Sequence, residues 1–272
     1  RLEKRTYKLI FFIMEQYSVL QKFDPVTDYF TDPYPHIVIE DALPWDLYEE
    51  LENNFPESQV LNTEPFDNGI CYRMKANRLL HPDEDIPEVW KKFTQYHTSA
   101  EWFNEVNGLF KPFMPNVLQK KFTENDLGAR GWADKNKNIW TDCQVVMHKP
   151  IVEKTSRTPH IDNPMEMWAG LLYMPYRDDD SSGGEFQIYE TQSKVKKVDM
   201  KSGRQIYEND LGKITKTVPY KRNTFVMFAN NSPNNVHGVS LRENATKYRR
   251  SVNIIGEFKR GYAKMYNVEE VR

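Results

Sequence analysis

The feature that most constrains the fold is a series of strand-length segments that begins near residue 138. These segments are WTDCQVVMH, MWAGLLYMP, GEFQIYE, TFVMFAN and RRSVNIIGEF, at residues 140–148, 167–175, 184–190, 224–230 and 249–258. Several are rich in β-branched or aromatic residues, and turn-forming stretches such as NNSPNN lie between them. Short strands divided by turns are typical of a β-sandwich or barrel. The second half of the chain is therefore predicted to form a β-barrel.

The first half of the chain has a mixed pattern. HIVIEDAL, from His36, alternates as a short strand does, and PWDLYEELENNFP, from Pro44, has apolar residues at helical spacing. The aromatic residues between Asp85 and Phe113 fit two amphipathic helices. We expect a mainly β protein with N-terminal helices (α+β). A single domain over 1–272 is predicted, with about 1–137 as strand and helical support and about 138–258 as the core.

Composition excludes some classes of function. The chain has 37 Lys and Arg against 39 Asp and Glu, so no bulk field favours nucleic acid as a partner. The apolar run Leu9–Met14 is too short to span a bilayer, and no membrane association is expected. Two cysteines, Cys71 and Cys143, do not form a disulfide framework, which favours a reducing, cytoplasmic location.

A lysine-rich insert lies between Thr191 and Lys221, and it contains KVKKVDMKSGR and GKITKTV. We expect a solvated hairpin or loop over the mouth of the barrel. Loops on a rigid scaffold commonly hold specificity, so this insert is predicted to contribute to substrate choice.

The motif TPHIDNP places His160 and Asp162 two residues apart, so on an extended strand both side chains point to one face. His237 lies 75 residues beyond Asp162 and offers a third ligand. Two histidines and one carboxylate leave three positions of a metal open, as in non-haem iron(II) oxygenases. His148 is the main rival ligand, but it has no adjacent carboxylate; the remaining histidines are interpreted as structural.

An arginine completes the pattern. Arg249 follows His237 by twelve residues and opens a strand, where it could hold the far carboxylate of a 2-oxo acid bound to the metal. Arg250 is the alternative, but strand alternation puts Arg249 on the polar face with Ser251 and Asn253. We therefore predict that Arg249 binds the acid and that Arg250 packs on the opposite face.

These motifs together resemble the iron(II)- and 2-oxoglutarate-dependent dioxygenases, near their prolyl-4-hydroxylase-like branch. The matching motifs are PHID, SSGGEFQIY, VPYKRNTFVMF, VHGV and KYRRSVNI in the second half, and YPHIVIEDALPWDLYEELENNFP near the start. The resemblance covers roughly residues 33–60 and 138–258. It implies a double-stranded β-helix, a jelly-roll barrel packed on the helices, with residues 138–258 as the catalytic core.

The resemblance also implies chemistry. Fe(II) would be held by His160, Asp162 and His237, with 2-oxoglutarate as cosubstrate and O2 as oxidant, and the reaction would release succinate and CO2. Gln144 and Tyr173 fall on strands that line the oxo-acid pocket in similar enzymes. Related halogenases lack the carboxylate that Asp162 keeps, so hydroxylation of a small-molecule or peptidyl substrate is expected.

Two other functions fit parts of the pattern. A cupin-type isomerase or hydrolase could use zinc with the same ligands, but it has no fixed need for Arg249. A non-catalytic jelly-roll binding module would not need three intact ligands.

Overall fold

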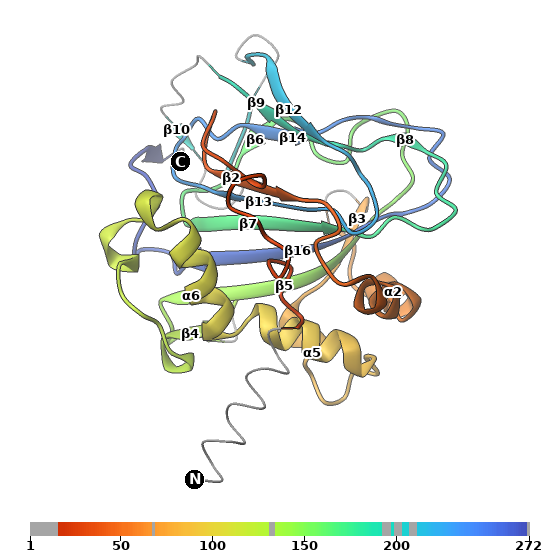
Figure 1. Cartoon of the computed structure of the whole chain (residues 1–272), viewed down its shortest axis with the longest axis horizontal. Coiled ribbons are helices and arrows are strands. Elements are labelled where there is room, and N and C mark those ends of the chain that lie inside the picture. Colours follow the sequence, from red (N-terminus) through yellow and green to blue (C-terminus); the bar gives the residue numbers. More distant parts are fainter. Residues whose placement is uncertain are drawn as a thin grey trace.

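The computed structural model describes residues 16–66, 69–130, 134–191, 197–198, 203–206 and 211–270 (Figure 1). Its largest element is a mixed sheet whose central strands carry the apolar segments of the sequence. In the order of pairing, the strands are β1 (Tyr29–Phe30), β2 (His36–Ile39), β13 (Phe225–Ala229), β7 (Glu166–Tyr173), β16 (Arg249–Phe258), β5 (Ile139–His148) and β3 (Cys71–Met74), with β4 (Leu127–Ala129) beside β5. The long pair β16 and β5 is antiparallel, from Arg249 opposite His148 to Phe258 opposite Ile139.

A smaller sheet faces the inner side of this main sheet. Its strands pair in the order β11 (Arg204–Gln205), β6 (His160–Ile161), β14 (His237–Val239), β9 (Phe186–Tyr189) and β12 (Ile214–Val218). Phe186 of β9 stacks on Phe228 of β13 at a centroid distance of 5.8 Å, which joins the two sheets. Among the described residues the two sheets do not join into one closed barrel. The prediction of a mostly β structure is therefore confirmed, but a closed barrel is not seen.

Helices in the first half of the chain cover the outer side of the main sheet (Figure 1). They are α2 (Trp45–Asn53), α3 (Glu57–Leu61), α4 (Ala76–Leu79), α5 (Glu88–His97) and α6 (Ala100–Leu109), followed by the 3-10 turns Lys111–Phe113, Asn116–Leu118 and Glu124–Asp126. Phe103 of α6 meets Trp168 of β7 at 4.9 Å between centroids. Trp90 of α5 donates from its indole nitrogen to the carbonyl of Leu51 in α2 at 3.0 Å. Burial of these aromatic faces supplies the main driving force for the packing.

The Thr191–Lys221 insert is described only in part, because residues 192–196, 199–202 and 207–210 lie outside the described ranges. Its described strands extend the small sheet through β11 and β12, while β10 (Lys197–Val198) pairs with β17 (Glu269–Glu270). The remaining pair is β8 (Ser182–Gly183) with β15 (Arg242–Glu243). Leu9–Met14 also falls outside the described residues.

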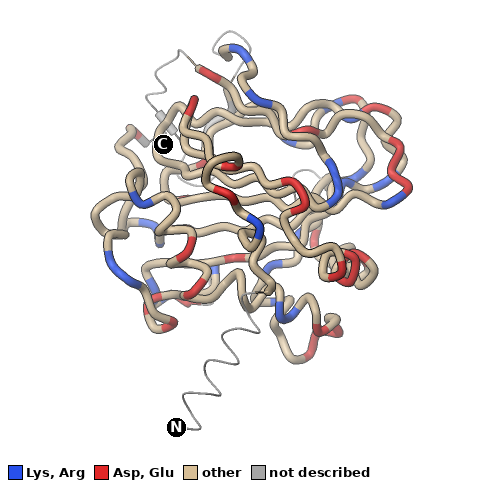
Figure 2. Tube along the Cα trace, viewed as in Figure 1, with Lys and Arg blue, Asp and Glu red and all other residues tan. Residues whose placement is uncertain are grey.

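Surface charge is mixed. Figure 2 shows acidic and basic residues interspersed over the chain, in line with the near-balanced composition. None of the described helices is long and apolar enough to cross a membrane.

The packing of Trp168 on β16 requires a glycine, which gives a first prediction. A Cβ at Gly256 would lie 2.5 Å from the indole ring, so Gly256→Ala should lower the free energy of unfolding by about 1–3 kcal/mol. Urea denaturation measures the effect. Gly108→Ala in α6 is the matched control, because its Cβ would meet nothing within 4 Å, and it should leave stability unchanged or slightly raised. Equal behaviour of the two variants would contradict the packing argument.

Acid stability gives a second prediction, through His97 at the end of α5. Its Nδ1 lies 2.8 Å from the carbonyl of Phe93, and the amide of Val19 donates to Nε2 at 3.3 Å. Burial lowers the pKa of His97 to about 3, against about 6.5 when unfolded. The unfolded chain therefore binds more protons between pH 3 and 6.5, and the free energy of unfolding falls as the pH falls through this window. His97→Gln should therefore reduce the slope of the free energy of unfolding against pH in this window, by at most ~1.4 kcal/mol per pH unit.

Urea denaturation at a series of pH values measures that slope. His81→Gln serves as the control, because His81 is exposed. An unchanged slope in His97→Gln would assign the acid sensitivity to other groups.

Candidate metal centre

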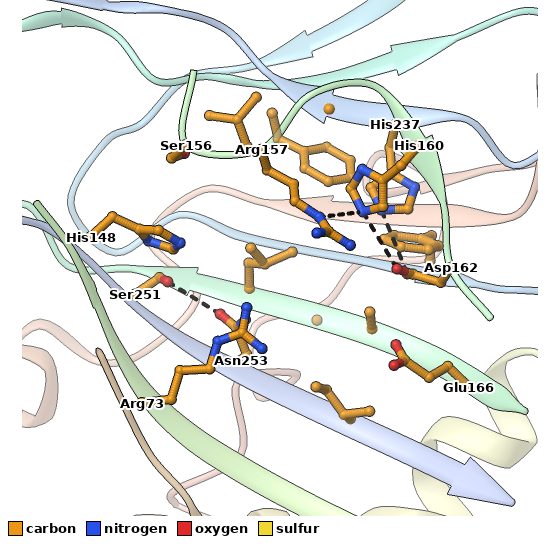
Figure 3. Close-up of a pocket in the computed structure, with 18 of the residues that line it drawn as sticks. Arg73, His148, Ser156, Arg157, His160, Asp162, Glu166, His237, Ser251 and Asn253 are labelled. Carbon is orange, nitrogen blue, oxygen red and sulfur yellow. Dashed lines mark hydrogen bonds and ion pairs between the residues drawn. The ribbon is translucent and has the colours of Figure 1, made fainter. Parts of the chain in front are cut away.

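Two histidines and a carboxylate meet at one point of the small sheet. His160 of β6 lies directly opposite His237 of β14 in antiparallel register, and Asp162 follows β6 (Figure 3). The Nε2 atoms of both histidines lie 3.5 Å from the Asp162 carboxylate, each from a different oxygen. The ligand atoms of all three side chains lie within 4.8 Å of one another. The structure thus brings together the three residues that the sequence motif predicts as ligands.

Hydrogen bonds on the far side of each ring set the direction of the lone pairs. His160 Nδ1 lies 2.8 Å from the carbonyl of Thr158, and His237 Nδ1 lies 3.1 Å from the carbonyl of Asn235. A carbonyl only accepts, so each Nδ1 carries the proton and each Nε2 presents a lone pair. Two lone pairs and a carboxylate therefore face one another, and a cation between them would relieve their repulsion. This donor set fits a divalent transition metal.

Electrostatics keep Asp162 and His237 in the form that binds a metal. Burial by itself would raise the pKa of Asp162, but the interactions with His237 and His160 hold that pKa well below its usual value. Burial lowers the pKa of His237 to about 3, and the nearby His160 adds to the fall. The rings of Phe228 and Phe186 enclose His237 at centroid distances of 4.4 and 5.4 Å. At neutral pH Asp162 is therefore ionised and His237 is neutral.

A cavity of about 150 Å³ opens between the two sheets, and the three candidate ligands line it together with residues of β16. Arg249 is almost fully buried there at 2% exposure, and Ser251 and Asn253 follow it on the same face. The Arg249 guanidinium lies over the rings of Tyr173 and Tyr220, at 4.9 and 4.8 Å from their centroids. Its remaining contacts are long ones, with Nε and one terminal nitrogen both 3.4 Å from the carbonyl of Gly184.

Arg250 points to the other face of β16. Its Nε donates to the carbonyl of Met174 at 2.9 Å, and its guanidinium lies 3.8 Å from the centroid of the Tyr176 ring. It does not line the cavity that holds His160 and Asp162. Strand alternation thus places the two arginines as the sequence argument expected, with Arg249 on the cavity side.

Gln144 and Tyr173 occupy supporting positions. Gln144 of β5 lies opposite Asn253 and donates to Asp142 at 2.5 Å, while its side-chain oxygen has no partner among the described residues. Tyr173 lies beneath Arg249, and burial raises the pKa of Tyr173 to about 12 against the opposing effect of that arginine. Neither residue is part of the cavity lining, so their contact with a cosubstrate stays a prediction.

Sequence reasoning missed several residues of the cavity wall. They are Arg73, Arg130, Arg157 and Glu166, and His148 was considered only as a rival metal ligand. His148 is not part of the ligand cluster among the described residues; it lies opposite Arg249 in register, and its Nδ1 has no partner there. Alternation on the strand that ends at His148 could have placed it beside Arg249. No sequence signal pointed to the arginines: Arg73 and Arg130 come from a region that matches no motif, and Arg157 precedes the TPHIDNP motif without being part of it.

A buried ion-pair cluster borders the metal centre. Arg130 donates to Glu166 at 2.7 Å and to Glu257 at 2.5 Å, and all three side chains are at most 17% exposed. Burial raises the pKa of Glu166 to about 7; Arg130 opposes the rise, while Asp162 and Glu257 add to it. Arg130, which follows β4, thus links that part of the cavity wall to β7 and β16. Its charge is already paired with these two carboxylates.

Comparison with known proteins bears on the fold alone. The sequence matches no protein-family model, and no curated protein is significantly similar to it. Among solved structures, the chain is similar to a prolyl-4-hydroxylase from Pseudomonas putida, with 12% identity, a TM-score of 0.49 and coverage of 90% of this chain and 99% of that one. It is also similar to a prolyl 4-hydroxylase from Phytophthora capsici, with 14% identity, a TM-score of 0.51 and coverage of 92% of this chain.

The chain spans 65% of the length of the Phytophthora capsici protein. At this identity the likeness concerns the backbone arrangement, and the motif order in the sequence agrees with it. The protein therefore has the fold of a prolyl 4-hydroxylase.

Proposed function

We propose that this protein is an iron(II)- and 2-oxoglutarate-dependent dioxygenase with a jelly-roll core. Its reaction would convert a substrate C–H bond, O2 and 2-oxoglutarate into a C–OH bond, succinate and CO2. One observation carries the proposal: a His-Asp-His cluster and a buried arginine without a carboxylate partner among the described residues line the same small cavity. Fe(II) bound there would supply the activation of O2 coupled to decarboxylation of 2-oxoglutarate.

Each residue has a definite task in this proposal. The Nε2 atoms of His160 and His237 and a carboxylate oxygen of Asp162 hold the metal, and the carbonyls behind the two rings fix the ring orientation. Arg249 binds the distal carboxylate of the oxo acid, since its guanidinium is preorganised against Tyr173 and Tyr220. His148, directly across the strand from Arg249, is placed to donate a second hydrogen bond to that carboxylate.

A zinc hydrolase or isomerase with the same three ligands is the competing function. Hydrolysis at zinc needs no buried cation at the far end of the cavity, whereas a dianionic oxo acid does. Mixing the protein with Fe(II) and 2-oxoglutarate without oxygen separates the two, because chelation by the oxo acid gives a weak visible charge-transfer band. A protein that binds Fe(II) but never gives this band would contradict the proposal.

Removal of the carboxylate ligand gives the third prediction. Asp162→Ala should weaken metal binding roughly a hundredfold or more, because a charged ligand is lost from a buried site. Equilibrium binding of Mn(II) or Fe(II) by calorimetry measures the effect, and urea denaturation of the metal-free protein checks the fold. Asp180→Ala, at an exposed loop position, is the matched control and should bind metal as the unaltered protein does. Full turnover by Asp162→Ala would refute the ligand assignment.

The two arginines of β16 give the fourth prediction. Arg249→Ala should raise the KM for 2-oxoglutarate roughly a hundredfold, since a bidentate charged partner is lost. Arg250→Ala should change this KM little, because Arg250 contacts Met174 and Tyr176 outside the cavity. Succinate formation at varied 2-oxoglutarate concentration gives the KM of each variant. Urea denaturation of each variant shows whether the substitution also destabilises the fold. The reverse ranking would place the cosubstrate on the other face of the strand.

A further inference from the structure

The cavity of the metal centre carries more positive charge than the proposed cosubstrate needs. Four arginines line it, and each comes from a different segment of the chain: Arg73, Arg130, Arg157 and Arg249. The acidic residues of the described lining are only Asp162 and Glu166. Such an imbalance in a small cavity favours an anionic ligand.

Two of the four arginines already have a task. Arg130 is paired with Glu166 and Glu257, and Arg249 is assigned to 2-oxoglutarate. For Arg73 and Arg157, no carboxylate lies within 4 Å in the part of the chain that the structure describes. The guanidinium groups of Arg73 and Arg157 therefore have no carboxylate partner among the described residues.

Arg73 has only weak partners on the described residues. It is half-buried on β3, its Nε lies 3.3 Å from the sulfur of Cys71, and its guanidinium lies 4.7 Å from the centroid of the Phe66 ring. A thiol sulfur is a poor acceptor, so the guanidinium keeps most of its capacity to bind an anion.

Arg157 approaches from the segment between β5 and β6, and its Nε donates to Nε2 of His160 at 3.0 Å. That lone pair is the one a metal would take, so metal binding would deprive Arg157 of its acceptor. Figure 3 shows Arg157 and Arg73 reaching into the cavity from opposite walls. His148 lies near the same arginines. Burial and the positive charges of Arg249, Arg73 and Arg157 lower the pKa of His148 well below its usual value.

The net charge of the cavity would remain positive with both ligands bound. With a divalent metal and dianionic 2-oxoglutarate in place, the metal and the oxo acid cancel. Asp162 then offsets one of the three charges on Arg73, Arg157 and Arg249, and the second carboxylate beside Arg130 offsets at most one more, so at least one positive charge stays uncompensated. Arg73 is half-buried and Arg157 is exposed at the rim, so an anionic group of the substrate would find charge-assisted partners there that an uncharged substrate would not use.

We infer that the substrate of this enzyme carries an anionic group, a carboxylate or a phosphate, which Arg73 and Arg157 hold between the metal ligands and β3. That the anion belongs to a substrate rests on the proposed function. The anion site itself depends only on Arg73 and Arg157. Arginine suits both groups, because its planar fork matches carboxylate and phosphate oxygens in bidentate geometry.

Calorimetric binding tests this directly. The protein is loaded with Mn(II) in place of Fe(II) and with saturating 2-oxoglutarate, and it is titrated with inorganic phosphate, with malonate or with the neutral malonamide. We expect at least one of the two anions to bind and malonamide not to bind. Arg73→Gln and Arg157→Gln should each weaken anion binding about tenfold or more. Whether phosphate or malonate binds more tightly distinguishes the two anionic groups.

Lys75→Gln is the matched control, because it removes the same charge from an exposed position two residues after Arg73 and outside the cavity. It should change anion binding less than twofold, and Arg73→Lys should restore part of what Arg73→Gln loses. The affinity for 2-oxoglutarate should be unchanged in Arg73→Gln, which separates this arginine from the cosubstrate site.

Three results would overturn the inference: equal binding of malonamide, undiminished anion binding by the two glutamine variants, or anion binding that appears only when 2-oxoglutarate is left out. The last would assign both arginines to the cosubstrate. If the protein binds neither Mn(II) nor 2-oxoglutarate, the proposed function fails by itself. The same titrations on metal-free protein then still decide whether Arg73 and Arg157 form an anion site.

Discussion

His160 and His237 lie opposite each other in the pairing of β6 with β14, and the position of the candidate metal centre depends on this cross-strand contact. The two strands come from segments far apart in the chain, yet antiparallel register sets their side chains on one face at close range. Asp162, two residues after His160, then reaches both rings at 3.5 Å. A shift of one residue in this register would turn one ring away and separate the ligands.

Neighbouring elements hold that register. On one side β11 pairs with β6, with Gln205 opposite His160. Gly203 permits the approach, because a Cβ there would lie 2.0 Å from the carbonyl oxygen of Ile161 and its φ is +71°. On the other side β9 pairs with His237 through Ile188. The insert of residues 191–221 thus contributes a strand beside the ligands, in addition to any part in substrate choice.

The main sheet supplies the charge for the proposed chemistry. Its helix-covered face is apolar and buries Trp168, whereas its cavity face carries Arg249, Ser251 and Asn253. Alternation along β16 therefore separates core packing from the cavity lining in one ten-residue strand. The cationic cavity favours small anions, and a metal between three acceptors would balance the negative side of the same space.

The sequence alone determined the features that depend on local pattern. Strand-length segments between turns located most strands, period-two alternation separated Arg249 from Arg250, and helical spacing located α2, α5 and α6. The ordered motif selected His160, Asp162 and His237, which the structure brings together. Only the tertiary structure decided that the sheets face each other without closing among the described residues, and that Arg73, Arg130 and Arg157 reach the cavity. The reason is physical: periodicity is set by neighbours along the chain, whereas the meeting of arginines from four segments depends on long-range strand pairing that no short motif encodes.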